Sequence, residues 1–164
     1  MDPVTAVGLA TSITGLLVKG AQVIKRIYSI YQEARELPEN LERCLCHVKS
    51  LIDIVTGLQI IISKPGVRCD EARIRKVKKI LDECQGVAES LGAKAVKIAG
   101  RGGRGLGTAV RAALWDIVND EELQRIDTVL GQNEHMLLLN IDLLILGGGR
   151  ETREVSTLLP NDAG

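Results

Sequence analysis

The chain has 164 residues, of which 45% are hydrophobic, yet it contains no Phe, one Trp and two Tyr. This length predicts a single domain with a sizeable core, and that core must consist of Leu, Ile, Val and Ala. Formal charges balance at 21 basic and 21 acidic residues, which argues against a nucleic-acid-binding protein.

The first predicted helix starts at Asp2-Pro3, with Asp as N-cap and Pro in the first helical position. It ends before Pro38, because the residue preceding a proline avoids helical backbone angles. Gly20 is the expected site of a kink or hinge. The residues preceding the apolar run include Asp2 rather than basic residues, so we do not expect a secretory signal.

Residues 3–18 of this helix carry no charge. Gly8 and Gly15 share one helical face with Thr11 and Ser12, beside bulky aliphatic residues, which suits close helix packing in a bundle or in lipid. At 1.5 Å per residue the uncharged run spans roughly 24 Å, short of the roughly 30 Å hydrocarbon core. Two interpretations remain open, an internal bundle helix and a membrane-inserting helix.

The second predicted helix covers residues 38–62, followed by a turn at residues 63–67 that contains Pro65-Gly66. Its apolar residues recur at steps of three and four and form one stripe. The stripe consists of Leu41, Leu45, Val48, Ile52, Val55, Leu58 and Ile62.

The third predicted helix follows Asp70, its expected N-cap. It has a heptad-like apolar seam of Ile74, Val77, Leu81, Cys84, Ala88, Leu91, Ala95 and Ile98. Basic residues lie around its first turns, largely off the seam: Arg73, Arg75, Lys76, Lys78 and Lys79. A solvated face is one interpretation of this cluster, and contact with anionic lipid is the other.

Charge is also separated along the chain. Residues 64–111 hold twelve basic and five acidic residues, whereas residues 112–164 hold three basic and ten acidic residues. This pattern indicates either a basic helix beside an acidic one or a basic surface that meets an anionic membrane.

A glycine-rich loop is expected at residues 100–107. Its Gly-x-Gly-x-x-Gly spacing follows a helix rather than a strand, and no Gly-Lys-Ser/Thr follows, so neither nucleotide-binding loop is predicted. A helix from Thr108 should break and restart at a capping box formed by Asn119 and Glu122. A Leu-rich helix then ends at Gly147-Gly148-Gly149. The sequence thus predicts an all-α bundle of four to five helices over residues 1–146 and a flexible tail over residues 147–164.

Catalytic and metal-binding patterns are sparse. Cys44-Leu45-Cys46-His47 lacks the paired Cys-x2-4-Cys spacing of zinc sites, and the four cysteines fit free thiols in a reducing cytosol. His47 and His135 have no neighbouring nucleophile of recognisable spacing. We therefore expect a cytoplasmic, non-enzymatic protein with no metal, cofactor or small-molecule substrate.

Two segments carry a family resemblance: the opening Met1-Asp2-Pro3-Val4-Thr5-Ala6-Val7-Gly8-Leu9-Ala10, and Arg111-Ala112-Ala113-Leu114-Trp115-Asp116 with the acidic restart and Leu-rich helix after it. Over roughly residues 1–146 the chain resembles the N-terminal domain that precedes NACHT, ankyrin or other repeat modules in fungal NOD-like receptors. That domain belongs with the HeLo-like helical bundles of fungal cell-death proteins.

The resemblance implies a cell-death or innate-immunity signalling domain that self-associates and inserts its released N-terminal helix into the plasma membrane. The implied partners are a second copy of the chain, a NOD-like receptor and plasma-membrane lipid. The alternative is a soluble module that only oligomerises or docks a partner. The membrane and self-association role falls on Val4, Val7, Gly8, Leu9, Ile13, Gly15, Leu16, Leu17 and Val18.

Overall fold

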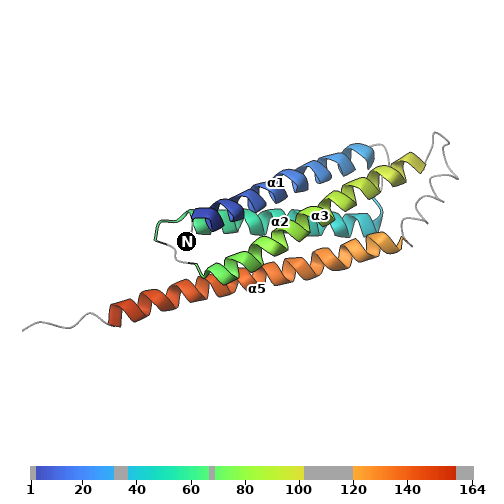
Figure 1. The fold of residues 1–164 in the computed structure, drawn as a ribbon. Helices are drawn as coiled ribbons and strands as arrows, with labels where there is room; N and C mark the ends of the chain where they lie inside the picture. Colours follow the sequence, from blue (N-terminus) through green and yellow to red (C-terminus); the bar gives the residue numbers. More distant parts are fainter. Residues whose placement is uncertain (1–2, 32–36, 67–68, 102–119, 158–164) are drawn as a thin grey trace, which may run out of the picture.

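The structure, a computed structural model, describes residues 3–31, 37–66, 69–101 and 120–157. These residues form four helices and no strand: α1 (Pro3–Tyr31), α2 (Glu39–Ser63), α3 (Glu71–Arg101) and α5 (Glu121–Thr157). Successive helices in this part of the chain alternate in direction (Figure 1). The predicted all-α bundle with a long N-terminal helix is confirmed.

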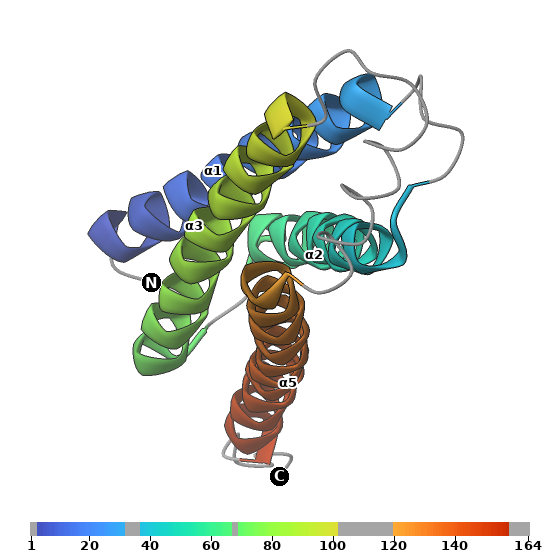
Figure 2. The ribbon, with the colours of Figure 1, turned by 90° about the vertical axis from the view of Figure 1, so that its right-hand side faces the viewer.

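The four helices occupy the corners of a bundle. α1 packs against α3 and α2, and α5 packs against the same two helices from the other side. α1 and α5 therefore lie at opposite corners, as the end-on view shows (Figure 2). The most extensive pairing is between α1 and α3, which run in the same direction.

The predicted apolar stripes form the core. Seven positions of the α3 seam, from Ile74 to Ala95, are at most 1% exposed, and the eighth, Ile98, lies where side chains are not described. In α2 the stripe is buried except at Ile52 and Ile62, which are partly buried. The core consists of aliphatic residues and two buried cysteines, Cys44 and Cys84, which agrees with the near absence of aromatic residues.

Helix termini follow the local sequence. Asp70 caps α3 as predicted, since its Oδ1 accepts a hydrogen bond from the Ala72 amide at 3.1 Å. The turn at residues 63–67 is confirmed for its described part, where Gly66 adopts a left-handed φ of 83°. Asp120, one residue later than the expected Asn119, caps α5 by accepting from the Glu122 and Leu123 amides at 2.9 and 3.2 Å.

α1 is one helix through Gly20, which is buried against Ile52 and Val48 of α2. Two helix boundaries differ from the predictions. α3 continues to Arg101, beyond the expected start of the loop. α5 continues through residues 147–149 to Thr157. Glycine lowers helix propensity but ends a helix only by adopting a non-helical angle, and the Arg and Glu residues that follow favour helix.

Several expectations lie outside the described residues. They are the Asp2 cap, the remainder of the glycine-rich loop at 102–107, the helix from Thr108 with Trp115, the Asn119 cap and the last part of the tail, 158–164.

Candidate functional site

The site suggested by the sequence is α1, and its packing against α3 follows a regular pattern. Gly8, Ser12, Gly15 and Lys19 of α1 face, in order, Lys78, Asp82, Gln85 and Glu89 of α3. Both sets advance by four, three and four residues, so the two parallel helices stay in register. We call this set of four pairs the α1–α3 row.

In three of the four pairs of the α1–α3 row, a small residue of α1 lies opposite a longer polar residue of α3, and in the fourth Lys19 lies opposite Glu89. Ser12 donates to Asp82 Oδ1 at 2.6 Å, and Lys78 Nζ donates to Asp82 Oδ2 at 2.8 Å. Lys19 Nζ lies 3.2 Å from Glu89 Oε1. A methyl group at Gly8 would lie 3.3 Å from Lys78 Cε, so glycine lets the lysine stem cross α1 closely.

The Asp82 carboxylate at the centre of this row is stabilised in its charged form. Partial burial alone would raise the pKa of Asp82, but the hydrogen bonds from Lys78 and Ser12 outweigh that effect and hold the pKa below its ordinary value. A polar contact of this kind fixes the α1–α3 register, whereas the apolar contacts beside it supply most of the burial.

The opposite side of α1 is uncharged and faces outward. Val4 is 77% exposed, Val7 66% and Val18 48%. Thr11 and Thr14 lie between them and are also exposed. The five residues are spaced by three and four, and we call them the outer face of α1. No charged residue interrupts it from Val4 to Val18.

The structure therefore divides the predicted site residues into three groups. Leu9, Ile13 and Leu16 belong to the core and are at most 1% exposed. Gly8 and Gly15 face α3, and Leu17 is partly buried. Val4, Val7 and Val18 lie on the outer face. Thr11, expected to share the glycine face, points outward and donates to the Val7 carbonyl instead.

Two helices among the described residues, α1 and α2, are long and apolar enough to cross a membrane by length and composition. Core helices of water-soluble bundles have the same composition. In each of the two, however, only 28% of the apolar window is buried inside the bundle. The other residues of these windows are partly buried or exposed, and several of the partly buried ones, such as Leu17 and Ile54, still pack against the core.

The five basic residues at the start of α3 do not act as one cluster. Arg75 lies 3.6 Å from Glu71, and Lys78 forms an ion pair with Asp82. Arg73 is half-buried, whereas Lys76 and Lys79 are exposed. None of these last three makes an ion pair within the described part of the chain. At the other end of α3, Lys94 pairs with Asp120 and Glu122 at 2.7 and 3.0 Å, which confirms the internal interpretation of the charge separation for that end.

A polar cluster that sequence reasoning missed joins α2 to α5. His47 Nδ1 lies 2.7 Å from Glu134 Oε2, and His47 Nε2 lies 3.3 Å from Asp127 Oδ1. Ser50 donates to Glu134 at 2.5 Å, and Arg43 Nε lies 3.3 Å from Asp127 Oδ2. The sequence carries a signal for this contact. Asp127 and Glu134 are one heptad apart, and Arg43, His47 and Ser50 follow one another at steps of four and three, so each set lies on one side of its helix.

The side chains of Cys44, Cys46 and His47 in α2 do not converge on one point. Cys44 is buried in the core, Cys46 is exposed and His47 faces α5, so the three neighbours point in different directions. Burial raises the pKa of the Cys44 and Cys84 thiols to about 12, which keeps them protonated. Within the described residues, no group of three or more His, Cys, Asp or Glu side chains is placed to hold a metal.

The nearly continuous apolar sequence from Met136 to Leu146 favours a helix buried in the bundle, but α5 also has an outer side. One side of this helix faces inward at every turn, through Leu137, Asn140, Ile141 and Leu144. Five large apolar side chains face outward and are 39–51% exposed. These residues, the outer face of α5, are Met136, Leu138, Leu139, Leu143 and Ile145.

Comparison of the chain with protein-family models, curated proteins and solved structures finds no match. Its function is therefore inferred from its residues and their arrangement.

Proposed function

We propose that this chain is a non-enzymatic signalling domain that self-associates and acts on membranes through α1, as the fungal cell-death bundles that it resembles are implied to do. The observation that carries the proposal is the outer face of α1. An uncharged, exposed helical surface runs over the whole span from Val4 to Val18, so α1 can present apolar groups to lipid without first losing a solvated charge.

The inner side of α1 explains why it stays in the bundle until triggered. Leu9, Ile13, Leu16, Val23 and Ile27 are at most 6% exposed. Exposing each such side chain to water costs about 1.5–3 kcal/mol. Release into water is therefore strongly unfavourable, whereas transfer into a bilayer replaces one apolar environment by another.

Length is compatible with this role once Lys19 is included in the span. Residues 3–24 of α1 carry this one charged side chain and span about 33 Å, against the roughly 30 Å hydrocarbon core. The first charged side chain after Val4 is Lys19. A lysine at this position can extend its ammonium toward the lipid headgroups while its stem stays in the apolar region.

Leakage of dye from vesicles of anionic and zwitterionic lipid tests the proposal. We expect the intact chain to cause leakage, and Val7→Lys or Thr11→Lys to reduce it at least tenfold, because a charge within the inserted run of a helix costs about 3 kcal/mol. Both positions are exposed in the bundle, so the substituted chains should still fold. Leu16 is unsuitable because it is buried.

Val96→Lys on α3 is the matched control, since Val96 is 46% exposed and lies outside α1. It should leave leakage unchanged. Absence of leakage by the intact chain at any lipid composition, with the fold verified by circular dichroism, would reject the membrane role.

The alternative, a soluble module that oligomerises or docks a partner, is favoured by a separate observation, the outer face of α5. It predicts a larger assembly in solution and no leakage. The two functions share self-association and differ in whether α1 leaves the bundle.

A further inference from the structure

The His47 cluster between α2 and α5 holds an imidazole whose two ring nitrogens each face a carboxylate. Nδ1 lies 2.7 Å from Glu134 Oε2, and Nε2 lies 3.3 Å from Asp127 Oδ1. A neutral imidazole carries a proton on one nitrogen, whereas an imidazolium carries a proton on each. The neutral ring can therefore donate to only one of the two carboxylates, and it turns a lone pair toward the other.

The other partners in the cluster leave one oxygen of each carboxylate to His47. Ser50 donates to Glu134 Oε1, and Arg43 Nε lies 3.3 Å from Asp127 Oδ2. Asp127 Oδ1 is buried, and no hydrogen bond reaches it from the described residues. A proton on His47 Nε2 supplies the missing donor. The hydrogen bonds of the cluster are thus complete only when the imidazole is charged.

The charges of the cluster also balance only with a protonated ring. Asp127 and Glu134 carry two negative charges, and Arg43 supplies one positive charge that it shares with the exposed Glu39. An imidazolium makes the four charges sum to zero within the cluster, whereas a neutral imidazole leaves one negative charge uncompensated. The Cys44 thiol, which also lies near Asp127, stays protonated because burial raises its pKa to about 12.

The ring lies directly on α5 and still reaches the solvent. Gly131 lies between the two carboxylates along α5, and a methyl group there would lie 3.4 Å from His47 Cε1. The His47 side chain is 31% exposed, so a proton can reach it without unfolding of the bundle. A histidine in an unfolded chain changes its charge near about pH 6.5. The cluster therefore contains a group that changes its charge close to neutral pH.

We propose that His47 is a pH-sensitive link between α2 and α5, which joins Asp127 and Glu134 when its ring is protonated and releases Asp127 when it is not. In the neutral ring the remaining proton stays on Nδ1, because the contact with Glu134 is the shorter one. Nε2 then turns a lone pair toward the buried oxygen of Asp127. This inference concerns the bundle itself and does not depend on the proposed membrane role of α1.

Acid favours the folded state through this link. The protonated ring has two carboxylate partners in the folded chain and none in the unfolded chain. Its contribution to stability is therefore fully present below about pH 6, and it is lost as the pH rises and the ring of the folded chain gives up its proton. α5 is held on α2 more firmly in mildly acidic solution than in mildly basic solution.

Urea unfolding at about pH 5.5 and about pH 8.5 tests the proposal. We expect His47→Gln to raise the equilibrium constant of unfolding about tenfold at the lower pH and about threefold or less at the higher pH, since hydrogen bonds to charged groups are the stronger ones. His135, which is exposed and makes no ion pair within the described residues, provides the matched control. His135→Gln should have the same small effect at both pH values.

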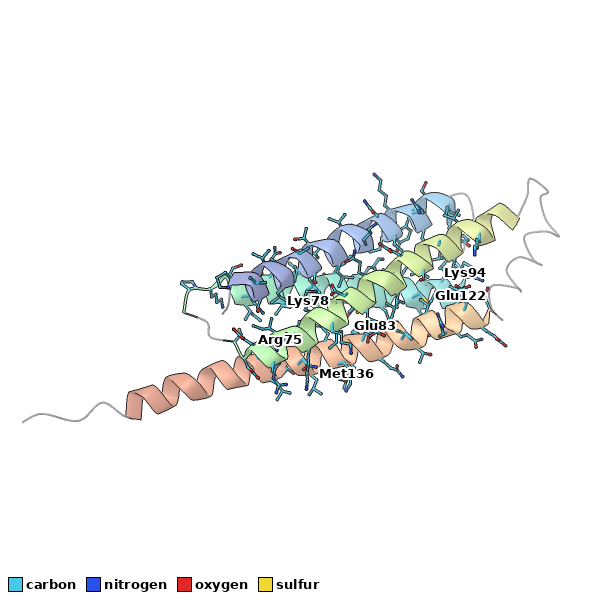
Figure 3. All side chains as sticks on the ribbon, viewed as in Figure 1. Arg75, Lys78, Glu83, Lys94, Glu122 and Met136 are labelled. Atoms are coloured by element: carbon cyan, nitrogen blue, oxygen red, sulfur yellow. The ribbon has the colours of Figure 1, made fainter. Side chains whose placement is uncertain are left out.

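A double-mutant cycle identifies the contact responsible. His47→Gln and Asp127→Asn should show a coupling of about fivefold in the unfolding constant at about pH 5.5 and none at about pH 8.5. Lys94 and Asp120, at the end of the bundle where Figure 3 labels Lys94 and Glu122, form the control pair. Their hydrogen bond raises the pKa of Lys94, and the pKa of Asp120 is lowered despite its partial burial. Lys94→Gln and Asp120→Asn should therefore show equal coupling at both pH values.

Nuclear magnetic resonance of the ring nitrogens provides a second measurement, on the unsubstituted chain. We expect both nitrogens of His47 to carry a proton at about pH 5.5 and Nδ1 alone to carry one at about pH 8.5. A ring protonated on Nε2 alone in basic solution would overturn the proposal. So would a coupling between His47 and Asp127, or an effect of His47→Gln, that is equal at the two pH values. Vesicle leakage judges the role of α1 separately.

Discussion

Single carboxylates fix the ends and the registers of these helices. Asp120 caps α5 and also receives Lys94 from α3. Partial burial opposes the charge of Asp120, yet the bond from Lys94 and the two amides keep its pKa below the ordinary value. Asp82 has the same role between α1 and α3. Each of these residues joins one helix to another through a carboxylate whose charged form is more favourable in the folded state than in the unfolded state.

The lowered pKa of Asp82 gives a pH prediction. A carboxyl with a depressed pKa in the folded state stabilises the fold above its unfolded pKa of about 3.9, and this contribution is lost as the pH falls through the lower folded value. Asp82→Asn should therefore be less stable than the original chain above about pH 5, and the difference should shrink as the pH falls below about 4.

Urea unfolding at several pH values measures this effect. Glu83→Gln, an exposed neighbour with no ion pair among the described residues, serves as the control and should follow the original chain. A difference between Asp82→Asn and the original chain that is constant from pH 3 to pH 7 would show that the carboxylate charge is not what matters.

At the scale of elements, each pair of neighbouring helices has its own polar contact. α1 and α3 share the α1–α3 row, and α1 and α2 share the hydrogen bond that Lys49 donates to the Tyr28 hydroxyl. α3 and α5 share Lys94 with its two carboxylates, and α2 and α5 share the His47 cluster. Apolar seams alone would permit several registers, because they repeat every seven residues. Polar contacts between particular helices select among them.

A double-mutant cycle on the His47 cluster tests this at the α2–α5 contact. His47→Ala and Glu134→Ala should each lower the free energy of unfolding by about 1–2 kcal/mol, since each leaves a partly buried partner without its hydrogen bond. The double variant should lose less than the sum, with a coupling of about 1 kcal/mol. Chemical unfolding at pH 7 provides the values, and strict additivity would mean that the two side chains do not interact.

The elements were predictable from the sequence because their signals are local. The seam of α3 and the stripe of α2 were read from three- and four-residue steps, and Asp70 from the capping rule. The continuation of α5 past Gly147 is not predicted, because a glycine run commonly ends a helix, although the residues after it favour helix. The sequence names Gly20 as a kink or hinge, whereas its contact with side chains of α2 depends on tertiary packing.

The site was only partly predictable, for a different reason. Helical spacing placed Gly8 and Gly15 on one face, but it could not show that this face meets Lys78 and Gln85 seventy residues away. Val7 and Leu9 are both apolar, and only tertiary packing decides that Val7 is exposed and Leu9 buried. The His47 cluster requires knowledge of which helices are neighbours.

In the whole molecule, α1 covers one side of the bundle. Removal of its first part tests how far the packing of the other helices depends on it. A chain lacking residues 1–18 loses Leu9, Ile13 and Leu16 from the core, while the packing of α5 on α2 and α3 remains. We expect it to retain helical circular dichroism, to bind the hydrophobic dye ANS and to unfold over a broader range of urea, as compact states without fixed packing do.

An equally sharp unfolding transition in the shortened chain would mean that α1 contributes little to the cooperative unit. Complete loss of helical signal would mean that the other three helices cannot persist without it. Either result would bear on whether α1 can leave the bundle without collapse of the remainder.

The α1–α3 row repeats its chemistry after one heptad. If α1 slides by seven residues toward the start of α3, about 10 Å along the axis, Gly15 comes to lie opposite Lys78 and Lys19 opposite Asp82. Glycine again meets a lysine stem, and an ammonium again meets a carboxylate. The core positions of both helices keep the same phase. Withdrawal of α1 along its own axis thus passes through an intermediate position, seven residues along, at which its polar partners are exchanged, whereas sideways separation breaks every pair at once.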